Sequence, residues 1–205
     1  DALINYISGL KNKESKYWPA QLHVVGKGIN WFHSVIWPAI LLSSVYKLPE
    51  KLLVHGYLNV GGKKMSKSTG NTISPLELLQ KYQTDSVRYS LLRNSVFDDS
   101  DYSEEMLIER NNNELANKLG NLVSRVSTLA EKYGLEKVSK TSLSGKITLK
   151  EVNNYFNNYE LHKALEVIFA YIDKCNEYIQ HKKPWETKDK KVLYELVFAI
   201  RNISI

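Results

Sequence analysis

The sequence predicts an α/β segment followed by an all-α segment. Two short apolar runs flank a helical stretch within residues 21–58, which is the pattern of a β-strand, a crossover helix and a parallel β-strand. From residue 74 onward, apolar residues recur at helical spacing. With 205 residues, 43% of them hydrophobic, the chain is long enough for one large or two small domains with cores.

The composition narrows the class of protein. A formal net charge of +6 weakly indicates a polyanionic partner. The single cysteine, Cys175, excludes an internal disulfide and a cysteine-based zinc site, and it suits a reducing, cytoplasmic setting. No apolar run reaches the roughly 18–20 residues of a membrane-spanning helix, and no signal peptide leads the chain. We expect a cytoplasmic protein without a membrane partner. Because the chain opens with Asp1 rather than Met, we also expect a fragment or a processed subunit.

The first segment should bind its ligand where two strands end. A strand over residues 21–26 runs into a tight turn at Gly26-Lys27-Gly28. A helix from about residue 30 is apolar on nearly every side, as in a buried helix, and Pro38 should kink or restart it. A second strand covers residues 51–58. Ligands of open parallel sheets bind outside the carboxyl ends of the strands, where the turns at 26–28 and 56–62 both fall.

A lysine-rich loop follows the second strand. It reads Lys64-Met65-Ser66-Lys67-Ser68 and is flanked by glycines at positions 61, 62 and 70. Glycines let the backbone turn, and ammonium groups act as mobile charges for phosphate. Judged by composition alone, a solvated basic turn is the commoner structure for such a loop, so both interpretations stay open.

His33 and Trp37 are four residues apart and therefore share one face of the predicted helix. Such a pair is more often core packing than a ligand contact. Spacing alone leaves both roles open.

Residues 74–102 are predicted to form connecting helices. Ser74 fits an N-cap, with proline at the first helical position and Glu77 in a capping-box arrangement. A second helix begins at residue 84, where Asp85 and Arg88 should form an ordinary surface ion pair. Residues 98–101 are predicted to be a solvated acidic turn before a helix at residue 103.

Three apolar stripes predict an α-helical bundle after residue 103. The first has its members at i, i+4, i+7, i+11 and i+14, namely Leu115, Leu119, Leu122, Val126 and Leu129. The second covers residues 161–179 and places Cys175 in the core as a small hydrophobe. The third begins at Leu193. Residues 135–150 lack a clear period and are predicted to be a loop. Amphipathic helices with short connections form a bundle.

Two polar features of this bundle have two interpretations each. Asn117, Asn121 and Arg125 form a second stripe, roughly 120° from the apolar one at 100° per residue. It is either a solvated helix side or a surface that binds base edges, since Asn and Arg make bidentate contacts to bases. Trp185 follows Pro184 among lysines. Its ring either caps the bundle or is exposed to stack on an unpaired RNA base.

Four motifs of the chain resemble methionyl-tRNA synthetases and occur in that family's order. Residues 26–39 resemble the segment that builds the amino-acid pocket, and Lys-Met-Ser-Lys-Ser is the signature loop of class I aminoacyl-tRNA synthetases. Residues 116–125 and the Pro184-Trp185 pair resemble the two anticodon-reading segments. The resemblance covers essentially the whole chain. It implies the carboxy-terminal half of such an enzyme.

This resemblance implies a fold and its division. The α/β part would be the second half of a Rossmann-type nucleotide-binding fold, and the all-α part an α-helical anticodon-binding bundle. The Rossmann-type portion with the lysine loop would cover residues 1–73, a connecting segment that contacts the tRNA stem residues 74–102, and the anticodon-binding domain, truncated at its carboxyl end, residues 103–205.

The resemblance also implies three groups of site residues. The methionine pocket would comprise Ala2, Tyr6, Ile29, His33 and Trp37, and an aromatic box suits a thioether. ATP would contact Gly26, Gly28, His55, Gly56, Tyr57, Lys64, Met65, Ser66, Lys67 and Ser68. Of these, Lys64 and Lys67 would be catalytic, because they would neutralise charge on the leaving pyrophosphate. The anticodon CAU would contact Asn117, Asn121, Arg125 and Trp185.

The implied reaction uses ATP with Mg²⁺ to convert methionine to methionyl-adenylate and then transfers methionine to tRNA(Met). No metal or zinc site is expected in the chain itself. The family has Asp, which helps to hold the ATP ribose, where this chain has Gly28, and Pro where it has Leu3. The His-Ile-Gly-His-type motif and the first half of the nucleotide-binding fold are missing from the sequence. We therefore expect a partner, an amino-terminal half that carries this motif, and no activity without it.

Two other functions stay open. The chain could be a non-catalytic tRNA-binding module derived from a synthetase, which the glycine at position 28 favours and the intact lysine motif disfavours. It could also belong to a synthetase for another amino acid, such as leucine or cysteine.

Overall fold

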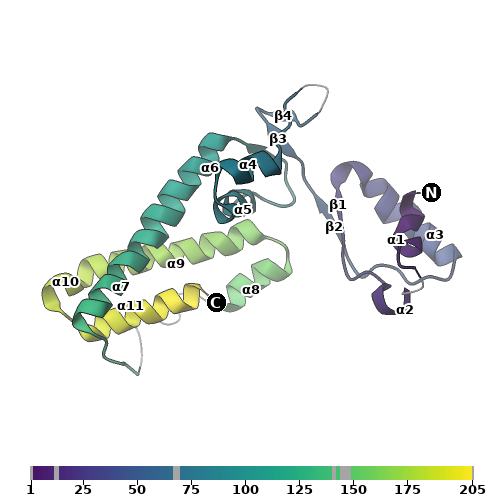
Figure 1. The fold of residues 1–205 in the computed structure, drawn as a ribbon. Helices are drawn as coiled ribbons and strands as arrows, with labels where there is room; N and C mark the ends of the chain where they lie inside the picture. Colours follow the sequence, from purple (N-terminus) through teal and green to yellow (C-terminus); the bar gives the residue numbers. More distant parts are fainter. Residues whose placement is uncertain (1, 12–13, 67–69, 140–141, 144–148, 205) are drawn as a thin grey trace. The chain divides into compact units, whose positions relative to one another are not determined.

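The computed structural model describes residues 2–11, 14–66, 70–139, 142–143 and 149–204. It divides the chain into two compact units (Figure 1). Unit 1 comprises Asp1–Met65 and Phe97–Asp101, and unit 2 comprises Ser66–Val96 and Tyr102–Ile205. Each unit is described by itself.

Unit 1 is built on a pair of parallel strands. β1 (His23–Gly26) pairs with β2 (Leu52–His55), in a register from His23 opposite Leu52 to Gly26 opposite His55. Short helical segments precede them: η1 (Ala2–Ile4), α1 (Asn5–Ser8) and α2 (Glu14–Tyr17). The crossover consists of η2 (Lys27–Ile29), η3 (Phe32–Ile36) and α3 (Trp37–Ser43). The predicted strand–helix–strand arrangement is confirmed.

The crossover helix differs from the prediction in its burial. Trp37 and Leu41 are each 1% exposed, but Trp31 is 64% and Phe32 is 53% exposed. The expectation of a helix buried on nearly every side is therefore wrong for unit 1 by itself. Pro38 lies in the first turn of α3, and the turn before it is the π-helix η3. The helix type thus changes where proline removes a backbone donor.

A second small sheet follows β2. Its strands β3 (Leu58–Val60), β4 (Lys63–Lys64) and β5 (Ser100–Tyr102) lie in the order β4-β3-β5. β3 and β4 form an antiparallel hairpin whose turn, Gly61–Gly62, has φ of +60° and +71°. Glycine adopts such angles without the steric cost of a Cβ. Lys64 therefore belongs to a strand, whereas the sequence predicted a loop.

Unit 2 is α-helical. Its segments are α4 (Pro75–Lys81), α5 (Thr84–Leu92), α6 (Glu104–Arg110), η5 (Asn111–Gly120), α7 (Asn121–Tyr133), α8 (Leu149–Asn157), α9 (Leu161–Lys182), α10 (Pro184–Thr187) and α11 (Lys190–Ile203). Figure 1 shows α7, α9 and α11 packed side by side, with α8 against α9. Leu122, Val126, Cys175 and Leu196 are each 0% exposed in their common core. The predicted apolar stripes, including Cys175 as a core residue, are confirmed.

Helices α4 and α6 begin where the sequence predicts, but only one of the two has a side-chain cap. Ser103 caps α6, since its Oγ accepts a hydrogen bond from the N–H of Met106 at 3.1 Å. Ser74 precedes α4, but its side chain makes no capping hydrogen bond, so the capping-box prediction is wrong. Asp85 and Arg88 form the predicted exposed ion pair, at 3.5 Å.

A partly buried ionic cluster connects the end of α5 to η5. Arg93 donates from Nε and Nη2 to the two carboxylate oxygens of Glu114, each at 3.0 Å, and the Tyr89 hydroxyl donates to the same carboxylate. Burial raises the pKa of Glu114, but the hydrogen bonds from Arg93 and Tyr89 and the nearby guanidinium charges outweigh it, so the pKa is lowered overall.

The segment before α9 contains a helix that the sequence prediction missed. Residues 135–139 and 142–143 are non-helical, but α8 begins at Leu149. Leu143 is 2% exposed, and its carbonyl accepts a hydrogen bond from the Tyr171 hydroxyl at 3.3 Å. The spacing of Leu149, Val152 and Phe156 was the available signal for α8.

Among the residues that the structure describes, no helix has the length and apolar character needed to span a lipid bilayer.

Candidate functional site

Unit 1 gathers three of the predicted methionine-pocket residues into one ring cluster. The Tyr6 ring lies 5.7 Å from the His33 ring and 5.9 Å from the Trp37 ring, between centroids. The Tyr6 hydroxyl and His33 Nε2 are 2.9 Å apart, and His33 Nδ1 is 3.0 Å from the carbonyl oxygen of Ile29. Because a carbonyl only accepts, Nδ1 is the donor, and Nε2 of a neutral imidazole then accepts from Tyr6.

The other two predicted pocket residues lie at the surface. Ile29 is 46% exposed and joins the cluster through its carbonyl. Ala2 lies in η1 and is exposed. Tyr6 is itself 40% exposed, so the cluster presents an open side.

Two further aromatic residues belong to this cluster and were not predicted. His23 is 6% exposed and packs edge-on against Tyr6, with ring centroids 4.6 Å apart. Its Nε2 is buried without a hydrogen-bond partner among the described residues. Burial, and then the charge of His33, lower the pKa of His23. Trp18 lies 6.0 Å from Trp37. The aromatic residues around the start of the first strand were the signal that could have found both.

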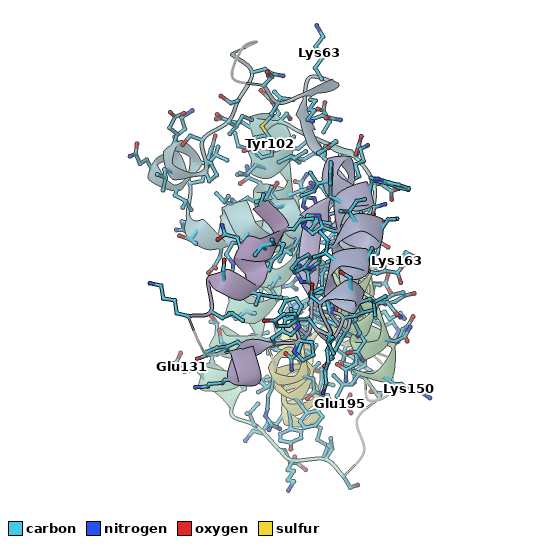
Figure 2. The ribbon with its side chains drawn as sticks, turned by 90° about the vertical axis from the view of Figure 1, so that its right-hand side faces the viewer. Lys63, Tyr102, Glu131, Lys150, Lys163 and Glu195 are labelled. Carbon is cyan, nitrogen blue, oxygen red and sulfur yellow. The ribbon has the colours of Figure 1, made fainter. Side chains whose placement is uncertain are left out.

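The lysine hairpin places Lys64 against an aromatic face. The Lys64 Nζ lies 4.2 Å from the centroid of the Tyr57 ring, a cation–π distance. The neighbouring Lys63 is exposed, and Figure 2 shows its side chain extending away from the hairpin. Met65 and Ser66 are partly buried, and the Ser66 N–H donates to Asn71 Oδ1 at 2.8 Å. The predicted site residues Lys67 and Ser68 lie outside the described residues.

Two of the three glycines predicted to contact ATP, Gly28 and Gly56, are sites of close approach. A Cβ atom on Gly28 would overlap the Tyr57 hydroxyl, and one on Gly56 would overlap the carbonyl of Asp98. His55 Nδ1 donates to the Gly56 carbonyl at 2.7 Å. At Gly26 an added Cβ would make ordinary contacts, at 3.6 Å from His55 and Tyr57. A larger residue at position 56 would therefore have to displace backbone, one at position 28 would have to displace only the Tyr57 side chain, and one at position 26 would displace nothing.

The acidic turn at residues 98–101 exposes its three aspartates to solvent, as predicted, and it is also hydrogen-bonded to other segments of unit 1. Asp99 accepts hydrogen bonds from Lys27 Nζ at 2.5 Å and from the Tyr57 N–H at 2.8 Å. Asp101 accepts from the Gly62 N–H at 3.1 Å. The bonds from Lys27 and then Tyr57 lower the pKa of Asp99. Backbone pairing of β5 with β3 brings these carboxylates to the hairpin, a long-range contact that local composition does not encode.

Unit 2 brings together two of the four predicted anticodon residues. The Arg125 guanidinium carbon lies 5.3 Å from the centroid of the Trp185 ring. Trp185 is partly buried and packs against the bundle core, in agreement with the first of its two interpretations, a ring that caps the bundle. Pro184 is fully buried beside it and fixes the start of α10.

The predicted polar stripe is modified by the helix type. Asn117 and Asn121 are both exposed, but Asn117 lies in the π-helix η5 and Asn121 begins α7. The i→i+5 hydrogen bonds of a π-helix widen the turn, so the 100° spacing assumed from the sequence does not hold before residue 121. The stripe is thus continuous only from Asn121 to Arg125.

Within the described ranges, no group of three or more His, Cys, Asp or Glu side chains could hold a metal ion.

Comparisons with known proteins converge on one enzyme class. The sequence model of the family described as tRNA synthetases class I (M) matches residues 1–127. A methionine–tRNA ligase of Thermotoga maritima is 42% identical over 201 residues, which cover 90% of this chain and 32% of that protein. One of Rickettsia prowazekii is 39% identical and is matched by the whole chain over 45% of its length.

A solved structure is similar over the same extent. The methionyl-tRNA synthetase of Mycobacterium tuberculosis, in complex with methionyl-adenylate, superposes with a TM-score of 0.90 at 33% identity. The match covers 99% of this chain and 45% of that protein. The chain thus spans less than half the length of each of these relatives.

Proposed function

Because the chain belongs to the family of class I tRNA synthetases (M), we propose that it forms part of a methionine–tRNA ligase. In that reaction a carboxylate oxygen of methionine attacks the α-phosphorus of ATP, the bond to the bridging oxygen breaks, and pyrophosphate leaves. The terminal ribose hydroxyl of tRNA(Met) then attacks the acyl carbon of methionyl-adenylate, and AMP leaves. Neither step needs a protein nucleophile, so the protein positions the reactants and stabilises charge.

The main observation behind the proposal is that the candidate methionine-binding residues and the candidate phosphate-binding lysine follow two neighbouring parallel strands. β1 leads into the segment that bears His33 and Trp37, and β2 leads to Tyr57 and Lys64. Since β1 and β2 are parallel, both segments leave the same edge of the sheet, where ligands of such sheets bind. This supports an aromatic pocket and a phosphate-binding lysine in one site.

Methionine binds in this proposal against the ring cluster. Tyr6, His33 and Trp37 supply polarizable faces for the thioether, and Ile29 and Ala2 supply aliphatic contacts. The hydrogen bond between Tyr6 and His33 supports a fixed orientation of both rings.

ATP binds along the glycine turns and the lysine hairpin. Lys64 and Lys67 stabilise the negative charge that grows on the pyrophosphate. Mg²⁺ enters bound to the triphosphate. The remaining residues proposed to contact the nucleotide are Gly26, Gly28, His55, Gly56, Tyr57, Met65, Ser66 and Ser68.

The anticodon of tRNA(Met) binds to the face formed by Arg125 and Trp185, with Asn117 and Asn121 beside it. Stacking of an unpaired base on the Trp185 ring and amide contacts to base edges are the interactions that such residues provide. In this proposal, residues 103–205 form the anticodon-binding domain, residues 74–102 the connecting segment, and residues 1–73 the catalytic portion. The single cysteine suits the cytoplasm, in which we place this reaction.

Activity needs protein beyond this chain. Unit 1 exposes several large apolar side chains, among them Trp31 at 64%, Leu42 at 65% and Val45 at 94%. Large apolar side chains exposed to this degree are consistent with a surface that another part of the protein covers. Together with the extent of the relatives, this supports an amino-terminal half, carrying the His-Ile-Gly-His-type motif, that packs on unit 1.

A second candidate is a non-catalytic tRNA-binding module. Gly28, at a position where the family has a ribose-binding Asp, favours it. The intact lysine motif favours the enzyme, because a module that only binds tRNA has no use for a pyrophosphate clamp.

Complementation tests the proposal. The chain is combined with the amino-terminal half of the Thermotoga maritima relative, and charging of tRNA(Met) with methionine is measured. We expect charging by the mixture, loss of about 10²–10³-fold in rate with Lys64→Ala, and a nearly unchanged rate with Lys63→Ala. A mixture that binds tRNA(Met) without charging it would favour the module instead.

A further inference from the structure

Two lysines from different segments of unit 1 converge on one aromatic ring. The Lys27 Nζ lies 5.0 Å and the Lys64 Nζ 4.2 Å from the centroid of the Tyr57 ring. Like charges repel, so two ammonium groups stay this close only where other groups compensate them. The negative face of the ring provides part of that compensation.

The carboxylate of Asp99 provides further compensation for the positive charge of Lys27. This carboxylate accepts a hydrogen bond from Lys27 Nζ at 2.5 Å, and the side chains of Lys27 and Asp99 are 48% and 37% exposed. Exposed ion pairs contribute little to stability, because water screens them. A ligand with several negative oxygens can therefore displace Asp99 from Lys27 at low cost.

We propose that Lys27 is a second phosphate-binding cation of this chain, that Tyr57 holds Lys27 and Lys64 as one platform, and that Asp99 is the counter-ion of Lys27 until phosphate replaces it. This rests on the proposed function, since the ligand is the phosphate chain of ATP. It adds Lys27 and Asp99 to the residues that act on it.

Tyr57 is held in place both at its backbone and at its hydroxyl group, so its ring can position two lysines. Its N–H donates to Asp99 Oδ1 at 2.8 Å, and its carbonyl accepts from the Ser100 N–H at 3.0 Å. At the other end, the hydroxyl fills the space where a residue other than Gly28 would place its Cβ. The ring is thus fixed between the glycine turn after β1 and the acidic turn at residues 98–101.

The topology places the platform where a ligand of a parallel sheet binds. Lys27 directly follows β1, and Tyr57 follows β2 after one intervening residue. Both strands end at the same edge, because β1 and β2 are parallel in register. Lys64 returns to this edge through the β3–β4 hairpin, which pairs Asn59 with Lys64.

Direct titration of the full chain with inorganic pyrophosphate tests the platform, since no other protein is needed for a preformed cation pair. Binding is measured by calorimetry for the wild type, Lys27→Ala, Lys64→Ala and Asp99→Asn, with Lys63→Ala as the matched control. Lys63 belongs to the same hairpin, and its ammonium has no ion pair or ring contact among the described residues. Thermal unfolding of each variant verifies that it is folded.

Lys27→Ala and Lys64→Ala should each weaken pyrophosphate binding about tenfold or more, the loss expected for one charge-assisted contact. Lys63→Ala should bind like the wild type. Asp99→Asn should bind more tightly than the wild type, because its amide oxygen can still accept from Tyr57 while the competing charge is gone. If Asp99→Asn acted only by damaging the structure, it would weaken pyrophosphate binding instead.

The platform is overturned if the wild type does not bind pyrophosphate, or if Lys27→Ala behaves like Lys63→Ala. The proposed function is judged separately, by methionine-dependent activity of the complemented chain. Loss at Lys64 alone would overturn the platform and leave the proposed function standing. Tenfold losses at both lysines without such activity would support the platform and contradict the proposed function.

Discussion

The Arg125 guanidinium lies over the Trp185 ring, 5.3 Å from its centroid, although the two residues belong to different helices, α7 and α10. This contact joins the two segments that we propose to bind the anticodon. The ring also packs against the bundle core, so its position is fixed by both neighbours.

Replacing Trp185 by alanine should weaken binding of a CAU anticodon stem-loop by about 1–3 kcal/mol, because the base loses its stacking partner. Fluorescence anisotropy with a labelled stem-loop measures this change. Trp185→Phe keeps an aromatic face and should retain most of the affinity. Equal affinities of the alanine variant and the wild type, with both folded, would contradict the proposed role.

Gly56→Ala should destabilise the chain by about 1–3 kcal/mol, because the new methyl group would overlap the Asp98 carbonyl, which is backbone and cannot move aside cheaply. Urea unfolding gives the free-energy difference. Gly26→Ala is the control, since its methyl group would make ordinary contacts at 3.6 Å and the backbone φ is −73°. Similar stabilities of the two variants would show that the Asp98 carbonyl does not lie as close to Gly56 as described.

Glu114→Gln should lower the free energy of unfolding by about 1–3 kcal/mol at neutral pH, because Arg93 loses its charged partner. The pKa of Glu114 is lower in the folded state, so its ionised form stabilises the fold above the usual carboxyl value of about 4.3. That contribution is lost as the pH falls through the lowered pKa.

The difference between Glu114→Gln and the wild type should therefore shrink below about pH 4, as measured by urea unfolding from pH 7 to pH 3. Asp85→Asn is the matched control, since Asp85 is 90% exposed in its ion pair and should change stability little at any pH. A difference independent of pH would mean that the Glu114 charge does not stabilise the fold.

Cys175 should react slowly with thiol reagents in the native chain. It is 0% exposed, and burial raises its pKa to about 11, so the reactive thiolate is scarce at pH 8. An Ellman assay should show a reaction limited by unfolding and a rapid reaction in denaturant. Since the sequence has one cysteine, the signal is unambiguous. A rapid native reaction would place Cys175 outside the core.

The sequence predicts those parts of the fold that local patterns encode. Parallel pairing of β1 with β2 follows from two apolar runs around a helix, and Leu122, Val126 and Cys175 are buried as their helical spacing requires. The family resemblance selects Tyr6, His33 and Trp37 for one pocket, and the structure brings their rings together.

The remaining features depend on long-range contacts that spacing does not encode. Asp99 reaches Lys27 and Tyr57 only because β5 pairs with β3, so the acidic turn could not be assigned from composition. His23 joins the ring cluster through packing against Tyr6. The helix from about residue 30 is predicted to be buried, but Trp31 within it is exposed, because burial depends on which elements cover the helix.

We propose that this chain supplies the pyrophosphate-binding and methionine-binding part of an active site that needs a second part. Methionine-dependent ATP–pyrophosphate exchange tests it most directly, with the isolated chain and the chain complemented by an amino-terminal half compared at equal concentration. We expect no exchange by the isolated chain, and exchange by the complemented chain that Lys64→Ala removes. Full exchange by the isolated chain, or none by a stable complemented complex, would contradict it.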